Sequence, residues 1–351
     1  MPRLRVIGRG SAVCDVILMM SLMSLGAVFL SRYADFTRRN SRDFPGAGVT
    51  PEDDDPRGET PPSLSQQTID DLLRRISDWR PAECRSRKYG QLPVATVVVV
   101  FSDYEFYDAK LTLLSLLRDA QLSQLVTEIL LVDDESSREQ VLQDTQDFIR
   151  SVSRSFPVVR LVRLRTHVGR VRARSLAVEQ HVTNDVVIFV DAGVVCIPGW
   201  LSPLLELVST TADGQTTIAV PHYDHLTHPV TLQYVETDRD LVASLSWSLT
   251  ISMRRRGTSR LLKDDVELSE SVAVVRGEVF AVRRSFLASI GGLYDARLED
   301  GTGVAEHVEL SLRTWLCGGS IKVRVMTIRL LLLIAARQLC YVKSLLFSGV
   351  C

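Results

Sequence analysis

The hydrophobic and polar positions follow two different patterns along the chain, and the change lies near residue 92. From there on, continuous β-branched apolar runs alternate with segments of helical spacing. Strands are expected at residues 94–101, 128–132, 158–164 and 185–190, and helices at 111–125, 137–152 and 168–180. Uninterrupted apolar runs are typical of strands buried on both faces, and helices between them indicate right-handed crossovers. The pattern therefore predicts an α/β fold with a mostly parallel sheet flanked by helices.

Outside this region the pattern is weaker. The pattern predicts short strands and loops at residues 222–260. It predicts a strand at 272–282 and a helix with one apolar face at 305–316. Upstream, residues 68–79 have the spacing of a short amphipathic helix. The last segment, 326–351, is apolar and basic. The sequence leaves open whether this segment seeks a membrane or is unrelated sequence.

The N-terminal part of the chain has an apolar stretch of another kind. Residues 11–30 carry Asp15 near one end and are otherwise uncharged, which is long enough to cross a thin bilayer. Arginines lie on both sides of it, so the positive-inside rule does not set its orientation. The sequence favours a membrane anchor, with a cleaved signal peptide or a buried soluble helix as alternatives. Residues 31–65 are rich in Arg, Asp, Pro and Gly and predict a flexible stem.

Composition narrows the range of partners only slightly. The formal net charge is −1 at pH 7, which gives no reason to expect nucleic acid as a partner. The six cysteines include no CxxC pair and show no metal-ligand spacing. Neither Asn40 nor Asn184 begins an Asn-x-Ser/Thr sequon. The candidate chemistry therefore has to come from motifs in the α/β region.

Acidic residues follow two of the predicted strands. Asp133 and Asp134 come at the end of the second strand, and Asp191 follows the fourth. Open α/β sheets bind ligands beyond the carboxyl ends of their strands, so these carboxylates are candidate ligand contacts; solvated turns are the plainer alternative. Nearby, residues 169–174 (Gly-Arg-Val-Arg-Ala-Arg) open a helix, and they form either a diphosphate site or a basic solvated surface.

The carboxylate of Asp191 has one more possible role. A transferase that uses a sugar nucleotide must neutralise the diphosphate leaving group, and divalent cations on carboxylate and imidazole ligands commonly do this. The end of the fourth strand, where Asp191 stands, is the place where such a cation would bind.

Short motifs occur in a definite order between residues 78 and 325. They are Asp78-x-Arg80, Cys84, Leu92-Pro93, Glu128 to Asp134, Gly169-x-x-Arg172-Ala-Arg174, Phe189-Val-Asp191, Gly199-Trp200-Leu201-x-Pro203, Pro221-x-x-Asp224, Trp247, Gly291 to Asp295, and Glu306-x-x-Glu309 to Gly319. In this order they resemble the catalytic domain of the polypeptide N-acetylgalactosaminyltransferases. No one motif is decisive, but the whole series is specific for that family.

The resemblance implies a GT-A fold and a retaining transfer of N-acetylgalactosamine (GalNAc) from UDP-GalNAc to Ser or Thr of a secretory polypeptide, with Mn²⁺ as cofactor. It implies that Asp133 or Asp134 contacts uridine and that Arg172 lies at the nucleotide. It further implies that Asp191 binds Mn²⁺ and that Glu306 is the catalytic-site contact to the sugar.

The same resemblance sets the expected organisation of the chain. We expect a single-pass type II protein of the Golgi membrane with a lumenal catalytic domain and without the family's lectin domain. Its expected parts are a cytoplasmic tail (1–10), a signal anchor (11–30), a stem (31–77), a glycosyltransferase domain (78–325) and a tail (326–351).

Several family residues are replaced in this chain. The family's Asp-Ser-His is Asp191-Ala-Gly here, and no histidine follows His307, so one of three metal ligands remains. Gly277-Glu stands where the family has two glycines facing the sugar, and His307 replaces an Asn. The disulfide pairing of Cys84 and Cys317 is left open. Two hypotheses therefore stand: an active glycosyltransferase, or a catalytically inactive homologue that binds and regulates a partner protein.

Overall fold

The chain divides into two units, Met1–Ser63 and Leu64–Cys351, and every residue described by the computed structural model belongs to the second. The described residues are 66–75, 88–103, 105–119, 122–156, 158–209, 212–227, 233–235, 241–247, 249–255, 269–295, 298, 305–324 and 329–333. The expected cytoplasmic tail and signal anchor, most of the expected stem, and Cys84 lie outside them. Among these described residues, no helix has the length and apolar character needed to cross a membrane.

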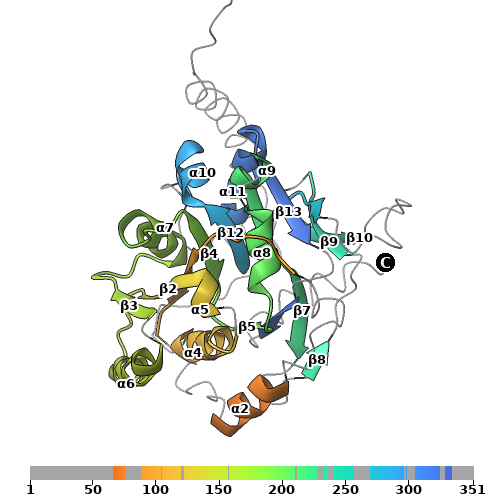
Figure 1. The fold of residues 1–351 in the computed structure, drawn as a ribbon. Coiled ribbons are helices and arrows are strands. Elements are labelled where there is room, and N and C mark those ends of the chain that lie inside the picture. The colour runs from red at the N-terminus through yellow and green to blue at the C-terminus, as the bar shows by residue number, and fades with distance from the viewer. Residues whose placement is uncertain are drawn as a thin grey trace, which may run out of the picture. The chain divides into compact units, whose positions relative to one another are not determined.

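An eight-stranded sheet forms the centre of the second unit (Figure 1). In spatial order its strands are β11 (Ser269–Ser271), β13 (Ser320–Arg324), β6 (Thr217–Val220), β12 (Val279–Arg283), β4 (Val186–Val190), β1 (Ala95–Phe101), β2 (Val126–Asp133) and β3 (Val159–Arg163). The β3-β2-β1-β4 half is parallel throughout. All four strands expected from the continuous apolar runs are therefore confirmed, as is the mostly parallel α/β fold.

The direction of β12 decides how the two halves of the sheet meet. This strand runs antiparallel to both of its neighbours, β4 and β6. Beyond it, β6 and β13 are parallel, and β11 is antiparallel to β13. Because β12 is reversed, its first residues lie at the same edge of the sheet as the last residues of β4.

Helices cover both faces of the sheet (Figure 1). They are α4 (Glu105–Leu116), α5 (Leu122–Leu125), α6 (Glu139–Ser155), α7 (Arg170–Gln180), α8 (Leu201–Leu207), α9 (Ala212–Gln215), α10 (Arg284–Ser289) and α11 (Ala305–Leu316), with α2 (Gln66–Arg75) before the first strand. Val97 and Val99 of β1 pack in one core cluster with α4, α6 and α8. Val98 and Val100 pack in another with α7, α10 and α11, as alternating side chains of a strand must.

Two small sheets complete the described part of the chain. One pairs β9 (Leu241–Leu245) with β10 (Ile251–Arg255). The other has the order β5 (Val194–Cys196), β14 (Arg329–Leu333), β7 (His222–Thr227) and β8 (Gln233–Val235). Strand β14 lies in the apolar segment after residue 325, where the sequence left the structure open, and it pairs with β5 and β7.

Two element predictions need correction. The helix expected at 111–125 is divided into α4 and α5 by a turn, in which the Asp119 carboxylate accepts the Gly199 N–H at 2.8 Å. The strand expected at 272–282 exists only from Val279 on, because Gly277 has a φ of +99°, outside the range of a strand. The helix expected at 305–316 is confirmed as α11.

Candidate functional site

The acidic residues found in the sequence lie at one edge of the sheet. Asp133 ends β2 and pairs in register with Phe101 at the end of β1. On the other side of β1, Phe189 of β4 is in register with Val98, so Asp191 follows β4 at the same edge. The backbone N–H of Asp191 donates to the Glu278 carbonyl at 2.8 Å, which ties this edge to the start of β12.

Asp134 fixes the position of α7. Its side chain is 2% exposed, and its carboxylate accepts the backbone N–H groups of Val168 (2.9 Å) and Gly169 (2.8 Å). The His167 imidazole lies 3.0 Å from the same carboxylate. Because these contacts hold the segment directly before α7, they set the phase at which the helix presents its side chains to the sheet edge.

Asp133 is engaged in a similar way on the next loop. It is 2% exposed and accepts the Ser136 N–H at 2.8 Å, while Arg163 Nε lies 3.8 Å from its other oxygen. A uridine contact by Asp133 or Asp134 stays a prediction. In the structure both carboxylates serve as anchors for loops at the ligand edge.

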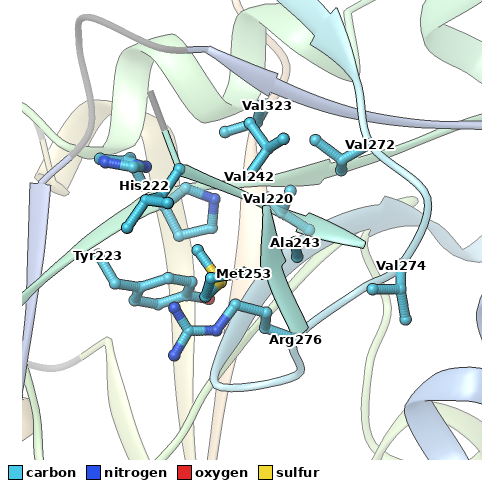
Figure 2. Close-up of a pocket in the computed structure, with 12 residues that line it drawn as sticks. Val220, His222, Tyr223, Val242, Ala243, Met253, Val272, Val274, Arg276 and Val323 are labelled. Atoms are coloured by element: carbon cyan, nitrogen blue, oxygen red, sulfur yellow. The ribbon is translucent and has the colours of Figure 1, made fainter. Parts of the chain in front are cut away.

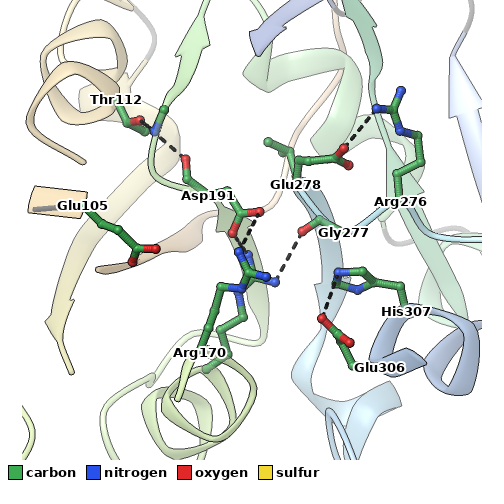
Figure 3. Close-up of polar contacts among 12 residues, drawn as sticks. Glu105, Thr112, Arg170, Asp191, Arg276, Gly277, Glu278, Glu306 and His307 are labelled. Atoms are coloured by element: carbon green, nitrogen blue, oxygen red, sulfur yellow. Dashed lines mark hydrogen bonds and ion pairs between the residues drawn. The ribbon is translucent and has the colours of Figure 1, made fainter. Parts of the chain in front are cut away.

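Asp191 faces two arginines of α7, Arg170 (Figure 3) and Arg174. Its Oδ1 is hydrogen-bonded to Arg174 Nη2, and its Oδ2 lies 3.9 Å from Arg170 Nη1. The two arginines are four residues apart and therefore lie on one side of the helix, one turn from each other. Arg170 is 49% exposed and Arg174 is 3% exposed, so one guanidinium can be reached from solvent and the other is enclosed.

Arg174 is a buried cation with a complete set of neighbours. Besides Asp191, it donates to the Gly277 carbonyl at 3.3 Å and to the Tyr294 hydroxyl at 3.4 Å, and it lies over the ring of Phe189. Burial alone would lower the pKa of Arg174, but the Asp191 carboxylate and Tyr294 outweigh it and raise that pKa. The guanidinium is therefore charged at every pH at which the protein is folded.

Glu306 and His307 lie in the first turn of α11, and both interact electrostatically with Arg174. Both are buried, and His307 Nε2 lies 3.5 Å from Glu306 Oε1. The imidazole packs so closely on Gly277 that a Cβ there would lie 1.9 Å from Nε2. Burial lowers the pKa of His307 to about 3, and the charges of Arg174 and Arg170 add to this effect. The imidazole is therefore neutral near pH 7, and Figure 3 shows it beside Gly277.

Seven residues thus form one group, the Arg174 cluster. They are Arg170, Arg174, Asp191, Gly277, Tyr294, Glu306 and His307. Of the residues predicted for the site, Asp191 and Glu306 belong to it. Arg172 does not, since its guanidinium lies 3.5 Å from Glu179 on another side of α7. Its contact with the nucleotide stays a prediction.

The sequence marked residues 169–174 as a candidate diphosphate site as a whole and gave the nucleotide contact to Arg172, and it did not single out Tyr294. The signal for Arg170 and Arg174 is their spacing of four residues at the start of a helix, which places them on the side opposite Arg172. Tyr294 lies in the Gly291 to Asp295 motif, but nothing in its spacing indicates a hydrogen bond to a buried arginine.

The residues at Asp191 do not fit the Mn²⁺ site that the resemblance implies. Both carboxylate oxygens face guanidinium groups, and Ala192 and Gly193 follow without a donor side chain. Gly193 instead donates its N–H to the Thr112 hydroxyl at 3.0 Å (Figure 3). Among the residues that the structure describes, no three His, Cys, Asp or Glu side chains are grouped to hold a metal ion.

A small pocket lies beside the site, between β6, β7 and the β9-β10 hairpin (Figure 2). Its volume is about 30 Å³, enough for a water molecule. Arg276 lines it, lies 4.6 Å from the centre of the Tyr223 ring and pairs with Glu278 at 3.0 Å. Glu278 in turn follows Gly277, so this pocket adjoins the Arg174 cluster through the start of β12.

A mostly parallel α/β sheet with charged groups at the carboxyl ends of its strands has the ligand edge that is typical of nucleotide-binding α/β folds. The family model described as Glycosyl transferase family 2 matches residues 106–283, and the chain belongs to this family. Over 261 residues it is 33% identical to mouse polypeptide N-acetylgalactosaminyltransferase 4, covering 72% of this chain and 42% of that protein. It is 30% identical to mouse polypeptide N-acetylgalactosaminyltransferase 5, covering 73% of this chain and 27% of that protein.

The comparison with solved structures agrees. A crystal structure of GalNAc-T7 with UDP, GalNAc and Mn²⁺ matches with a TM-score of 0.63 and 24% identity, over 83% of this chain and 56% of that one. This match confirms the GT-A-like fold. The relatives confirm the resemblance to polypeptide GalNAc-transferases, and the chain spans less than half the length of the two mouse proteins.

Proposed function

We propose that this protein transfers GalNAc from UDP-GalNAc to Ser or Thr of a polypeptide, with retention of the anomeric configuration. The observation that carries the proposal is the Arg174 cluster, which places a carboxylate, two guanidinium groups and Glu306 at the ligand edge of a glycosyl transferase family 2 fold. The relatives named as polypeptide N-acetylgalactosaminyltransferases support the donor and the acceptor class.

The reaction exchanges one bond at the anomeric carbon of the donor. The bond to the β-phosphate oxygen breaks and its electron pair leaves with UDP, while the acceptor hydroxyl oxygen forms the new bond. The hydroxyl proton passes to the departing diphosphate or to solvent, which balances the charges. In this scheme Glu306 contacts the sugar, and Asp133 or Asp134 contacts uridine from the loops they anchor.

Mn²⁺ is a part of the family scheme that the residues at Asp191 do not support. The GalNAc-T7 structure holds UDP, GalNAc and Mn²⁺. Here Asp191 is engaged by Arg170 and Arg174, and its two following residues offer no side-chain donor. We therefore assign no step of the transfer to a metal ion, and metal dependence becomes an experimental question.

We place the protein in the Golgi membrane as a single-pass type II protein with its catalytic domain in the lumen. The uncharged apolar residues 16–30 support the anchor. An epitope at each end of the full chain, tested for protease protection in intact microsomes, decides the orientation.

Transfer can be measured directly with the full chain in detergent. UDP-GalNAc is supplied with a mixture of Ser- and Thr-containing peptides, and mass spectrometry detects the addition of one N-acetylhexosamine. We expect addition that is lost in Glu306→Gln, which removes the charge but keeps the shape. Glu139→Gln, at an exposed position of α6, serves as the matched control and keeps full transfer.

Failure would have a definite meaning. If the full chain binds UDP but modifies no peptide from UDP-GalNAc or other UDP-sugars, the transferase function is wrong. The inactive homologue that binds a partner protein would then take its place.

A further inference from the structure

We propose that Arg170 binds the diphosphate of the nucleotide and that the buried Arg174 supplies a second, fixed positive charge behind it, in place of a divalent cation, so that donor binding needs no metal. This inference rests on the proposed function only in requiring that the ligand is a nucleoside diphosphate or its sugar ester. It assigns to two arginines the charge compensation that the family resemblance assigns to Mn²⁺.

The first argument is the position of Arg174. Its guanidinium is hydrogen-bonded to the Asp191 oxygen that a cation would need, and it is held there by the Gly277 carbonyl and the Tyr294 hydroxyl. A metal ion at Asp191 would have to displace a buried charge or lie against it. The two like charges would repel each other at this short distance, and most strongly on the side of the buried Arg174. Arg174 is therefore a permanent positive charge at the place where the family resemblance implies an exchangeable metal ion.

The second argument is the accessibility of Arg170. Its side chain is 49% exposed, and its contact with Asp191 Oδ2 is 3.9 Å long. Exposed ion pairs of this length contribute little stability, so replacing this contact with Asp191 by a contact with phosphate loses little. A guanidinium can bind a phosphate through two parallel N–H groups, which a compact metal ion or an ammonium cannot imitate.

The third argument is that Arg170 stands where helix stability disfavours it. The first turn of α7 contains no acidic residue, although the positive end of the helix dipole favours acidic side chains and disfavours basic ones. Gly169, which precedes the helix, has no side chain that could cap it, and its own N–H donates to the Asp134 carboxylate. A residue that breaks a local rule at a ligand edge is best explained by the ligand it binds.

Binding of UDP alone tests the proposal. Calorimetry on the full chain measures the Kd of UDP in EDTA and again in Mn²⁺, and we expect the two values to agree within about twofold. Arg170→Leu is expected to raise both values by about tenfold or more, since a charged hydrogen bond to phosphate is lost. Arg170→Lys restores part of the affinity. Arg150→Leu removes an exposed arginine of α6 and is the matched control.

Asp191→Asn distinguishes the arginine pair from a metal site. If Arg170 binds the diphosphate, removing the nearby negative charge keeps UDP binding at least as tight. If a metal on Asp191 binds it, the same change abolishes UDP binding. Thermal melting of each variant, measured beside calorimetry, shows that it is folded. Arg170→Leu is used as the main variant because its half-exposed side chain is not part of the core.

Each outcome decides between this inference and the proposed function. Metal-independent UDP binding that is lost in Arg170→Leu supports the inference, whether or not peptides are modified. UDP binding or transfer that requires Mn²⁺ overturns the inference and leaves the transferase function standing. No UDP binding under either condition overturns the inference and counts against the transferase function as well.

Discussion

Asp191→Asn should destabilise the fold because it leaves the buried guanidinium of Arg174 without its negative partner. The substitution keeps the shape of the side chain but removes the charge that compensates Arg174. Arg174 is 3% exposed and carries a raised pKa, so it remains charged and cannot escape to solvent. The Gly277 carbonyl and the Tyr294 hydroxyl are the hydrogen-bond partners that remain for it.

The size of the effect follows from burial. Removing one partner of a fully buried ion pair commonly costs about 3–5 kcal/mol. Asp191 is 19% exposed, and an Asn can still accept one hydrogen bond, so we expect about 2–3 kcal/mol. For a domain of this size, that loss lowers the melting temperature by roughly 5–10 °C. Arg170→Leu, which breaks the half-exposed partner pair, should cost no more than about 1 kcal/mol.

Thermal melting followed by circular dichroism and urea titration of the full chain measure both variants side by side. The reasoning depends on the contrast between them rather than on either value alone. If Asp191→Asn and Arg170→Leu melt at the same temperature, Asp191 does not compensate Arg174, and the account of this cluster is wrong. A double variant, Asp191→Asn with Arg174→Met, should recover part of the loss because no buried charge remains.

Three further predictions follow from the same region. Gly277→Ala should cost at least about 1–3 kcal/mol more than Gly291→Ala in urea unfolding, because both have positive φ but only Gly277 contacts the His307 ring. The pKa of His307 is about 3 when folded and 6.5 when unfolded, so stability is lost as pH falls below about 6.5, by at most ~1.4 kcal/mol per pH unit. The urea midpoint of unfolding, measured near neutral pH and at acidic pH, should fall less with decreasing pH in His307→Asn than in the wild-type protein. An equal fall in both proteins would contradict the assigned pKa. Arg313→Lys should lower the stability of the fold by about 2–4 kcal/mol, because the buried guanidinium binds Glu309 and three backbone carbonyls that an ammonium cannot reach together. Thermal melting measures this, and a melting temperature equal to that of the wild-type protein within error would argue against it.

The sheet was predictable wherever burial and strand structure coincide. The run 94–101 is β1 almost residue for residue, because a central strand covered on both faces has no polar position to interrupt the pattern. The strand prediction for residues 272–282 was wrong before Val279, because there burial and strand structure do not coincide. Val272, Val274 and Val275 are buried and β-branched, but they lie in a loop whose N–H at Val275 donates to the Ser311 hydroxyl. Burial alone does not distinguish a strand from a packed loop.

The site was predictable in its acidic part and less so in its basic part. Asp133, Asp134 and Asp191 lie at one edge because parallel strands end together, which the sequence order already implies. The choice among three arginines depends on the phase of α7. That phase is set by the two backbone hydrogen bonds to Asp134, a tertiary contact that no local pattern contains. The resemblance pointed to Arg172, and the structure brings Arg170 and Arg174 to Asp191.

The reversed strand β12 also has a consequence for how the chain is made. In space it separates β4 from β6, yet the ribosome makes it after both of them. Until Val279 emerges, the edge of β4 is unpaired, and its five residues are all apolar. An unpaired apolar edge pairs readily with other chains, so nascent or truncated forms that end before β12 are prone to aggregate. The strand order therefore predicts that the nascent chain needs chaperones until β12 is made, whatever the substrate of the folded protein is.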